Sequence, residues 1–219
     1  MTDTLCQVTS YTYADVNDVT AFSYSGAVNT TGGVSFGYDS VFNRLTSMAD
    51  ATGTTSFSYN PVVTGTTSSG LLASVTGPLA NSTISYTYDP NKNRLTQSSS
   101  GAVTDYQYNA ANEQVVITPP TGAPTTQTFD AVGNLTLQNA GGALTTMVWS
   151  PENRLLSVSN PDGSGEQNTY SADGLRKSKT SAGTTTNLTW DNQNLLLETT
   201  TSNVIDARYT DFPGELSHF

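Results

Sequence analysis

The chain has 219 residues and a formal net charge of −10; 35% of its residues are hydrophobic and 12% are charged. This length suits one large domain or two small ones. A strongly acidic chain repels phosphate backbones, so we expect no nucleic-acid partner. No apolar run approaches the roughly 20 residues of a membrane helix, so we expect no membrane span.

The chain opens with a lead-in over residues 1–37. Tyr11 and Tyr13 precede a run that predicts a degenerate first repeat, and residues 27–33 predict a turn. The N-terminus lacks the basic and then apolar layout of a signal peptide. We expect the chain to be a piece of a longer polypeptide, with clear repeats over residues 38–219.

One sequence motif of eight residues, which we call the phrase, recurs through the clear repeats. One copy reads Tyr88-Asp89-Pro90-Asn91-Lys92-Asn93-Arg94-Leu95, and residues 38–45 are nearly identical. Its leading aromatic residue returns about every 20 residues, at Tyr38, Tyr59, Tyr88, Tyr108, Phe129, Trp149, Tyr170, Trp190 and Tyr209. A period this steady indicates a repeat architecture.

Each copy of the phrase predicts a chain reversal between two strands. The Asp or Asn after the aromatic residue can bond the backbone two residues on, and a later Gly or Asn can adopt a positive φ. Before the turn, large apolar residues alternate with small ones, as at Tyr86 and Tyr88, which is the period of a strand. A second turn closes each unit, at Asp50-Ala51-Thr52-Gly53, Ser100-Gly101, Gly141-Gly142, Asp162-Gly163 and Ala182-Gly183.

The interval after Tyr59 is longer than the others and predicts a loop insertion over residues 60–70. Residues 119–124, which are rich in proline, are a shorter interruption, and no linker marks a domain boundary. We therefore predict a single array over residues 1–219. Its roughly eighteen strands would have to twist and curl. The predicted fold is all-β, with tandem β-hairpins forming one long, strongly curved antiparallel sheet.

The phrase resembles the tyrosine-aspartate (YD) repeat of the Rhs family. The residues that carry the resemblance are Tyr38-Asp39, Tyr88-Asp89, Phe129-Asp130 and Trp190-Asp191, with the Asn-Arg-Leu or Gly-Asn-Leu that follows several of these turns. It extends from about Tyr11 to Phe219. Similar proteins include bacterial Rhs polymorphic toxins, the shell components of Tc toxins, wall-associated proteins and teneurins.

The resemblance implies a β-sheet ribbon that spirals into a hollow shell, of which this chain would form part of the wall. It also implies a secreted or cell-surface location. The partner would be the rest of a longer Rhs-type polypeptide or its enclosed cargo. The self-cleaving core segment of the toxin members is not matched in this chain, so self-cleavage and toxicity are not expected of it.

Four repeated aspartates are the first candidates for chemistry: Asp39, Asp89, Asp130 and Asp191. They occupy equivalent turn positions, so they should be spread along an edge instead of converging. We expect them to cap turns and not to bind a metal or act in catalysis.

Residues 160–166 suggest a calcium loop, but the twelfth position from Asn160 holds Ser171 and not the bidentate Glu that such a loop uses. His218 and Cys6 are the only residues of their types and lie near opposite termini. Because they lie so far apart in the sequence, they do not predict a catalytic pair of nucleophile and general base. We therefore predict no catalytic, cofactor or metal site, no cofactor and no enzymatic activity.

Arg44, Arg94 and Arg154 recur at one position of the phrase. Pairing with nearby turn carboxylates is the expected role, and binding of an acidic ligand is the alternative. The rows of aromatic residues are expected to pack on the sheet. An exposed row would instead form a sugar-binding platform, which quenching of Trp149 or Trp190 fluorescence would report.

The sequence thus favours a non-enzymatic structural repeat protein, a segment of a shell that encloses or displays a cargo. One alternative is an extracellular carbohydrate-binding or adhesion module. Another is a surface fibre that assembles by pairing of edge strands between copies.

Overall fold

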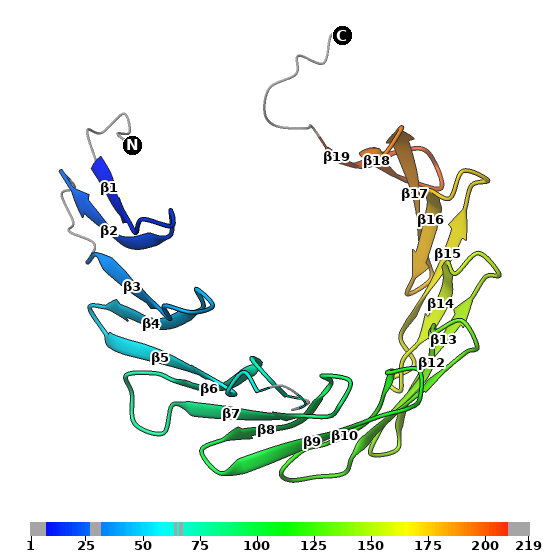
Figure 1. Cartoon of the computed structure of the whole chain (residues 1–219). Helices are drawn as coiled ribbons and strands as arrows, with labels where there is room; N and C mark the ends of the chain where they lie inside the picture. Colours follow the sequence, from blue (N-terminus) through cyan, green and yellow to red (C-terminus); the bar gives the residue numbers. More distant parts are fainter. Residues whose placement is uncertain (1–7, 27–31, 64, 66–67, 210–219) are drawn as a thin grey trace. The chain divides into compact units, whose positions relative to one another are not determined.

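The computed structural model describes residues 8–26, 32–63, 65 and 68–209, and every regular element within them is a β-strand (Figure 1). None of the described segments is a helix able to cross a membrane. The strands fall into two compact units, within residues 1–122 and residues 123–219. The boundary coincides with the proline-rich interruption at residues 119–124, while a single array remains a prediction.

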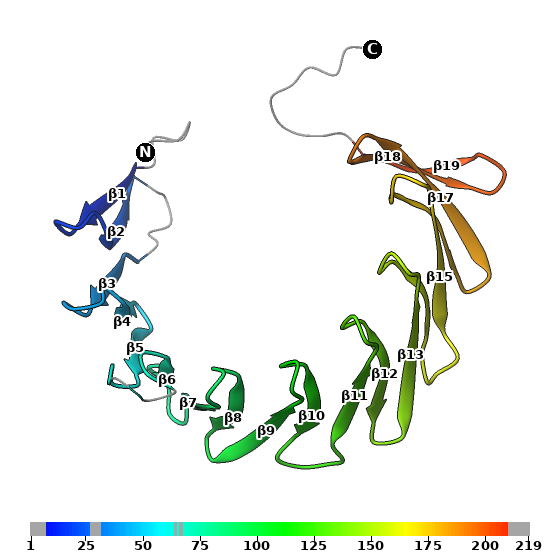
Figure 2. The same ribbon diagram turned by 45° about the vertical axis from the view of Figure 1, so that its right-hand side comes forward.

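The first unit is a ladder in which each strand pairs antiparallel with the next along the chain. Within the described residues of this unit, no pairing joins its first strand to its last, so the ladder is open (Figure 1, Figure 2). Its strands are β1 (Val8–Tyr13), β2 (Val19–Ser25), β3 (Val34–Tyr38), β4 (Leu45–Asp50), β5 (Gly53–Tyr59), β6 (Leu72–Thr76), β7 (Thr83–Tyr88), β8 (Arg94–Ser99), β9 (Ala102–Tyr108) and β10 (Gln114–Thr118).

The second unit repeats this antiparallel order. Its strands are β11 (Thr125–Phe129), β12 (Leu135–Ala140), β13 (Ala143–Trp149), β14 (Leu155–Ser159), β15 (Gly165–Tyr170), β16 (Arg176–Ser181), β17 (Thr184–Asp191), β18 (Asn194–Thr200) and β19 (Ile205–Arg208). The predicted all-β, antiparallel, hairpin-built fold is confirmed.

The phrase folds as a five-residue turn held by two backbone hydrogen bonds. In the copy at residues 89–93, the Asp89 amide donates to the Asn93 carbonyl (2.9 Å) and the Lys92 amide to the Asp89 carbonyl (3.0 Å). The fourth residue has a positive φ in every copy of this turn, at Asn17, Lys92, Asn112, Gly133, Asn153, Gly163, Gly174 and Asn203. Asn and Gly dominate because they adopt this conformation at the lowest cost.

The nearly identical copy at residues 38–45 closes one residue later. The Asp39 amide donates to the Arg44 carbonyl (2.9 Å), and Asn43 has the positive φ. Tyr38 therefore lies opposite Leu45, whereas Tyr88 lies opposite Arg94. The longer turn places Asn43 in the left-handed region, whereas the turn at residues 89–93 places Lys92 there.

Other predicted turns are confirmed. Ser100-Gly101, Gly141-Gly142 and Ala182-Gly183 are two-residue hairpin loops with positive φ at both positions. The predicted insertion replaces the phrase turn after β5, where the Asn60 amide donates to the Leu71 carbonyl (2.8 Å). Part of that loop, and most of the turn predicted at residues 27–33, lie outside the described residues.

A β-bulge stands at each leading aromatic residue that the structure pairs within a unit. Opposite Thr87 and Tyr88, for example, the partners are Thr96 and Arg94, so Leu95 is an extra residue. The same shift occurs at Tyr13, Tyr38, Tyr59, Tyr108, Phe129, Trp149, Tyr170 and Trp190. Bulges bend a strand and increase its twist, so the repeat carries its own source of curvature.

The sheets are single layers. Among the described residues, Leu188 (7% exposed) is the only buried hydrophobic residue and Asn168 (6% exposed) the only buried polar one. Side chains instead alternate between half-buried and exposed, as along β9 and β13. We call the half-buried side the aromatic face, because it carries the leading aromatic residues. The opposite face carries paired hydroxyls, such as Thr87 with Thr96 (2.7 Å).

Candidate functional site: the aromatic face

The leading aromatic residues tie each repeat to the one before it. The Tyr59 hydroxyl donates to the Leu45 carbonyl (2.8 Å), and the Trp149 Nε1 donates to the Leu135 carbonyl (2.8 Å). Equivalent bonds of 2.7 to 3.1 Å start at Tyr38, Tyr88, Tyr108, Tyr170 and Trp190. We call this contact the aromatic joint.

The acceptor of each joint has a fixed position. Leu45 lies opposite Tyr38, and Arg94, the acceptor for Tyr108, lies opposite Tyr88. The acceptor is thus the residue opposite the preceding leading aromatic residue, beside its bulge. A half-buried Tyr or Trp needs a partner for its polar tip, and the bulge supplies one.

The leading aromatic residues differ in their exposure to solvent. From Tyr38 to Trp190 the leading aromatic residues are half-buried. Tyr13 (56% exposed) and Tyr209 (45% exposed), near the two ends of the described chain, are open. Along most of the row, including both tryptophans, the rings therefore pack on the sheet and do not form a free platform.

Three of the four repeated aspartates cap their turns as predicted. The Asp39 carboxylate accepts from the Phe42 amide (2.6 Å), the Val41 amide (3.1 Å) and Arg44 Nε (2.7 Å). The Phe42 amide, followed by the Arg44 guanidinium, lowers the pKa of Asp39 to about 2.

In the other two caps an Asn replaces the Arg. Asp130 accepts from the Asn134 side chain and amide (both 2.9 Å), and these bonds lower its pKa. At Asp89, burial acts to raise the pKa, but the bonds from Asn93 (2.8 and 2.9 Å) outweigh it, so the pKa is lowered. Each of the three carboxylates is held in its own turn.

Asp191 differs from the other three. It pairs with Asn194 at the end of β17, across a two-residue loop in which Asn192 has a positive φ. No backbone amide among the described residues caps its carboxylate. The Asp that follows an aromatic residue therefore caps only the longer form of the turn.

The calcium-like stretch is also a turn. The Asn160 amide donates to the Ser164 carbonyl (2.8 Å), and the Ser164 amide donates to the Asp162 carboxylate (2.9 Å). Glu166 is part of β15 and pairs with Arg176 (3.2 Å). Within the ranges that the structure describes, no three His, Cys, Asp or Glu side chains gather as a metal site would require. Cys6 and His218 lie outside the described residues.

The three arginines of the phrase lie over aromatic rings of the next repeat. The guanidinium carbon of Arg44 is 4.5 Å from the Tyr59 ring centre, and that of Arg94 is 4.5 Å from Tyr106. Arg154 is 5.8 Å from Tyr170. Such stacking is favourable for a cation on an aromatic face.

Their polar partners differ. Arg44 pairs with Asp39, as predicted, and also donates to the Gly70 carbonyl (3.3 Å). Arg154 donates to the Ser171 carbonyl (3.1 Å), and Arg94 donates to Gln97 (3.0 Å), while the buried Arg94 Nε has no hydrogen-bond partner in the described part of the chain. Neither forms an ion pair with a carboxylate among the described residues, so the predicted pairing holds for Arg44 alone.

Asparagines join neighbouring turns along one edge. Asn93 and Asn91 both donate to the Asn112 side chain (2.9 Å each), and Asn134 donates to Asn153 (3.0 Å). Asn43 bonds Asp18 in the same way. Each residue type of the phrase therefore contacts either its own turn or the adjacent repeat.

An ionic cluster on β15 to β18 was not predicted. Lys179 pairs with Glu198 (3.1 Å), whose side chain is 14% exposed and also accepts from the Tyr209 hydroxyl (3.0 Å). Arg176 bonds Glu166 and the buried Asn168 (3.3 Å). Counting back from Tyr170 in steps of two would have placed Asn168 and Glu166 on the aromatic face.

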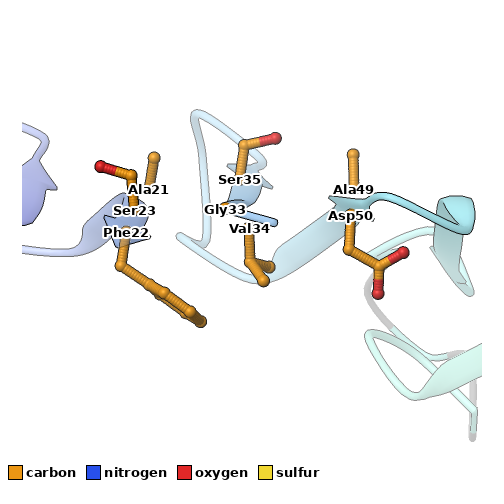
Figure 3. Close-up of a pocket in the computed structure, with 8 residues that line it drawn as sticks. All are labelled: Ala21, Phe22, Ser23, Gly33, Val34, Ser35, Ala49 and Asp50. Carbon is orange, nitrogen blue, oxygen red and sulfur yellow. The ribbon is translucent and has the colours of Figure 1, made fainter. Parts of the chain in front are cut away.

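A shallow recess crosses β2, β3 and β4 (Figure 3). Ala21, Ser35 and Ala49 point to one side, and Phe22 and Val34 to the other, as expected for a single layer. Its one carboxylate, Asp50, is bonded by the Thr52 amide (2.8 Å) and hydroxyl (2.6 Å). The recess brings together no set of groups able to perform a reaction.

No protein-family model matches the chain, and no curated protein matches it in sequence. Among the solved structures that are similar to it are the Photorhabdus luminescens Tc holotoxin pore with a mutated TccC3, and the TcdB2-TccC3-Cdc42 complex. The first match covers 92% of this chain at 14% identity and a TM-score of 0.49. The second covers 93% at 14% identity and a TM-score of 0.48. This chain spans 14% of the length of each matched chain.

Proposed function

We propose that this chain is a non-enzymatic structural segment, part of a shell wall whose aromatic face lies against an enclosed or displayed polypeptide. The observation that supports the proposal is that the side chains of the phrase form hydrogen bonds within the sheet. Its aromatic, Asp, Asn and Arg side chains are bonded within the sheet, in joints such as Tyr59 to Leu45 (2.8 Å). Residues engaged in this way are not free to act on a substrate.

The single layer supports the second part of the proposal. Protein sheets usually bury one face against another layer. Here the aromatic face is half-buried by its own neighbours only, with Leu188 the one buried hydrophobic side chain among the described residues. Covering it with polypeptide would remove further apolar area from water, which is favourable. Following the family resemblance, we place this assembly outside the cell or at its surface.

A binding experiment tests this proposal. The probe is reduced, alkylated α-lactalbumin, which is permanently unfolded, and the readout is its protection from a protease by the full chain. We expect Tyr106→Thr, on the aromatic face, to weaken protection. Gln107→Thr is the matched control, because Gln107 is the next residue of β9 and is exposed on the other face. Equal protection by both variants, or none by the native chain, would refute the proposal.

Carbohydrate binding is the second candidate, and one observation favours it. On β1 and β2, the rings of Tyr11 (49% exposed) and Tyr24 (41%) contact Phe22, and the ring of Tyr13 (56%) contacts Tyr11. Open aromatic rings of this kind could stack on sugars. Because both tryptophans lie elsewhere, tyrosine fluorescence across a glycan panel is the appropriate readout. Quenching that Tyr24→Ala removes would support this candidate, and silence across the panel would reject it.

A further inference from the structure

Arg94 is a cation on the aromatic face that pairs with no carboxylate among the described residues. It lies opposite Tyr88, and its guanidinium carbon is 4.5 Å from the Tyr106 ring centre and 6.0 Å from that of Tyr86. The two rings come from β9 and β7, the strands on either side of β8 (Figure 1). A charge beside apolar rings loses hydration, which costs free energy until an opposite charge or hydrogen bonds replace the water.

Two nitrogen atoms at the tip of Arg94 are available to a ligand. Nη1 donates one hydrogen to Gln97 Oε1 (3.0 Å) and has a second hydrogen. Nη2 makes no hydrogen bond among the described residues and, unlike the buried Nε, is open to solvent. The paired hydrogens of a guanidinium match the two oxygen atoms of a carboxylate. The tip of Arg94 is therefore suited to a carboxylate.

The acidic residues on the neighbouring elements do not reach this tip. Asp89 is held in its own turn by the side chain and amide of Asn93 (2.9 and 2.8 Å). Asp105 pairs with Thr96 and is exposed on the opposite face of the sheet. The charge of Arg94 is thus left without a counter-charge by the elements around it.

The equivalent position in a later repeat shows how such a cation is compensated within the chain. Arg176 lies opposite the leading residue Tyr170, the position that Arg94 holds in its own repeat. It donates to Glu166 (3.2 Å) and to the buried Asn168 (3.3 Å). These partners stand four and two residues before Tyr170, on the aromatic face.

The repeat of Arg94 lacks both partners. The positions four and two residues before Tyr88 hold Ile84 and Tyr86, which carry no carboxylate. The arginine is not needed for the turn or the joint, because other repeats have leucine opposite the leading aromatic residue, at Leu45, Leu72, Leu135, Leu155 and Leu195. Arg94 therefore differs from both kinds of neighbour: it is charged, and its acidic partner is absent from its repeat.

We propose that Arg94 binds the carboxylate of an aspartate or glutamate in a polypeptide that lies against the aromatic face. This inference rests on the proposed function and adds to it the chemistry of one contact. Nη1 and Nη2 donate to the two carboxylate oxygens, Gln97 orients the guanidinium, and Tyr86 and Tyr106 contact the apolar residues beside the acid. Because the whole chain carries −10, a preference for an acidic partner must arise from a local contact of this kind.

Two short peptides test the inference. Both are acetylated and amidated and share one sequence of leucine and threonine, with a single glutamate at the centre of one and a glutamine in its place in the other. Their affinities for the full chain are measured by fluorescence anisotropy at one ionic strength, because salt screens ion pairs. We expect the native chain to bind the glutamate peptide about tenfold more tightly than the glutamine peptide. Arg94→Leu should abolish this preference, and it introduces the residue that equivalent positions already hold.

Lys92→Asn is the matched control, because it removes the same charge from an exposed turn of the same repeat and suits the positive φ there. It should keep the preference, and circular dichroism confirms that both variants are folded. Equal affinities of the native chain for the two peptides would overturn the inference and leave the proposed function standing. Loss of the preference in Lys92→Asn would overturn it in the same way. If neither peptide binds, the inference falls, and protection of α-lactalbumin decides separately whether the proposed function falls too.

Discussion

At the scale of single residues, the repeated phrase divides its work between its own turn and the adjacent repeat. Asp39 caps its turn, while Tyr59 and Arg44 connect neighbouring repeats. In a sheet with almost no buried side chains, such bonds take over part of the role of a core. Their individual contributions to stability can be measured by removing single atoms.

The aromatic joint should be measurable through one hydroxyl. Tyr88→Phe removes the hydroxyl that donates to the Leu72 carbonyl (2.8 Å) and keeps the ring. We expect the free energy of unfolding to fall by about 1 kcal/mol in urea titrations. Tyr106→Phe is the control, because that hydroxyl makes no hydrogen bond among the described residues, and it should cost much less. Equal losses in the two variants would contradict the joint.

The Asp39 cap should make stability depend on acidity. The folded pKa is about 2, below the ordinary value of 3.8, so the stabilising contribution is complete above pH 3.8 and is lost as pH falls towards 2. We expect Asp39→Asn to flatten the fall in melting temperature over this window. Asp191→Asn, at an uncapped position, should leave the profile unchanged. A native profile in both variants would rule the cap out.

At the scale of the elements, the strands were largely predictable and the bulges were not. Period-two spacing at Tyr86 and Tyr88 identified strand β7, and Gly141-Gly142 identified a hairpin loop. The bulge beside Tyr88 adds one unpaired residue without changing the alternation before the turn, so the sequence pattern does not reveal it. The contact of Arg94 with Tyr106 depends on that register and was missed for the same reason.

Lys92 is the one residue at the left-handed turn position that is neither Asn nor Gly (φ 71°). Positive φ strains a side chain with a Cβ and costs Asn less than Lys. We expect Lys92→Gly to raise the free energy of unfolding by about 0.5–1 kcal/mol in urea titrations. Lys92→Ala removes the same charge but keeps the strain, and it should bring no gain. A gain in both variants would point to the charge instead.

Gly174 tests the contact between neighbouring turns. A Cβ there would lie 3.0 Å from Arg154 Nη2, at a φ of 96°. Gly183 has a φ of 76°, and a Cβ there would meet nothing within 4 Å. Both Ala substitutions should cost about 1 kcal/mol through backbone strain. Gly174→Ala should lower the melting temperature further, because it displaces the guanidinium from the Ser171 carbonyl. Equal melting temperatures would show that the arginine contact contributes nothing.

At the scale of the whole molecule, each unit is a stack of hairpins in which a repeat contacts only its neighbours. The regular recurrence from Tyr38 to Trp190 made this organisation predictable. The charged cluster around Glu198 and the exposed rings on β1 were not, because they depend on which side chains the pairing of the strands brings together. In such arrays stability is close to a sum of repeat and neighbour terms.

The most direct test of this account is hydrogen exchange, followed by mass spectrometry, in the native chain and in Tyr88→Phe. If joints bind adjacent repeats, the substitution should speed exchange in β6 and β7, which share the lost bond, and leave β1 and β2 of the same unit unchanged. Faster exchange spread evenly over the unit would mean that it is stabilised as one cooperative body. That result would contradict a wall held together repeat by repeat.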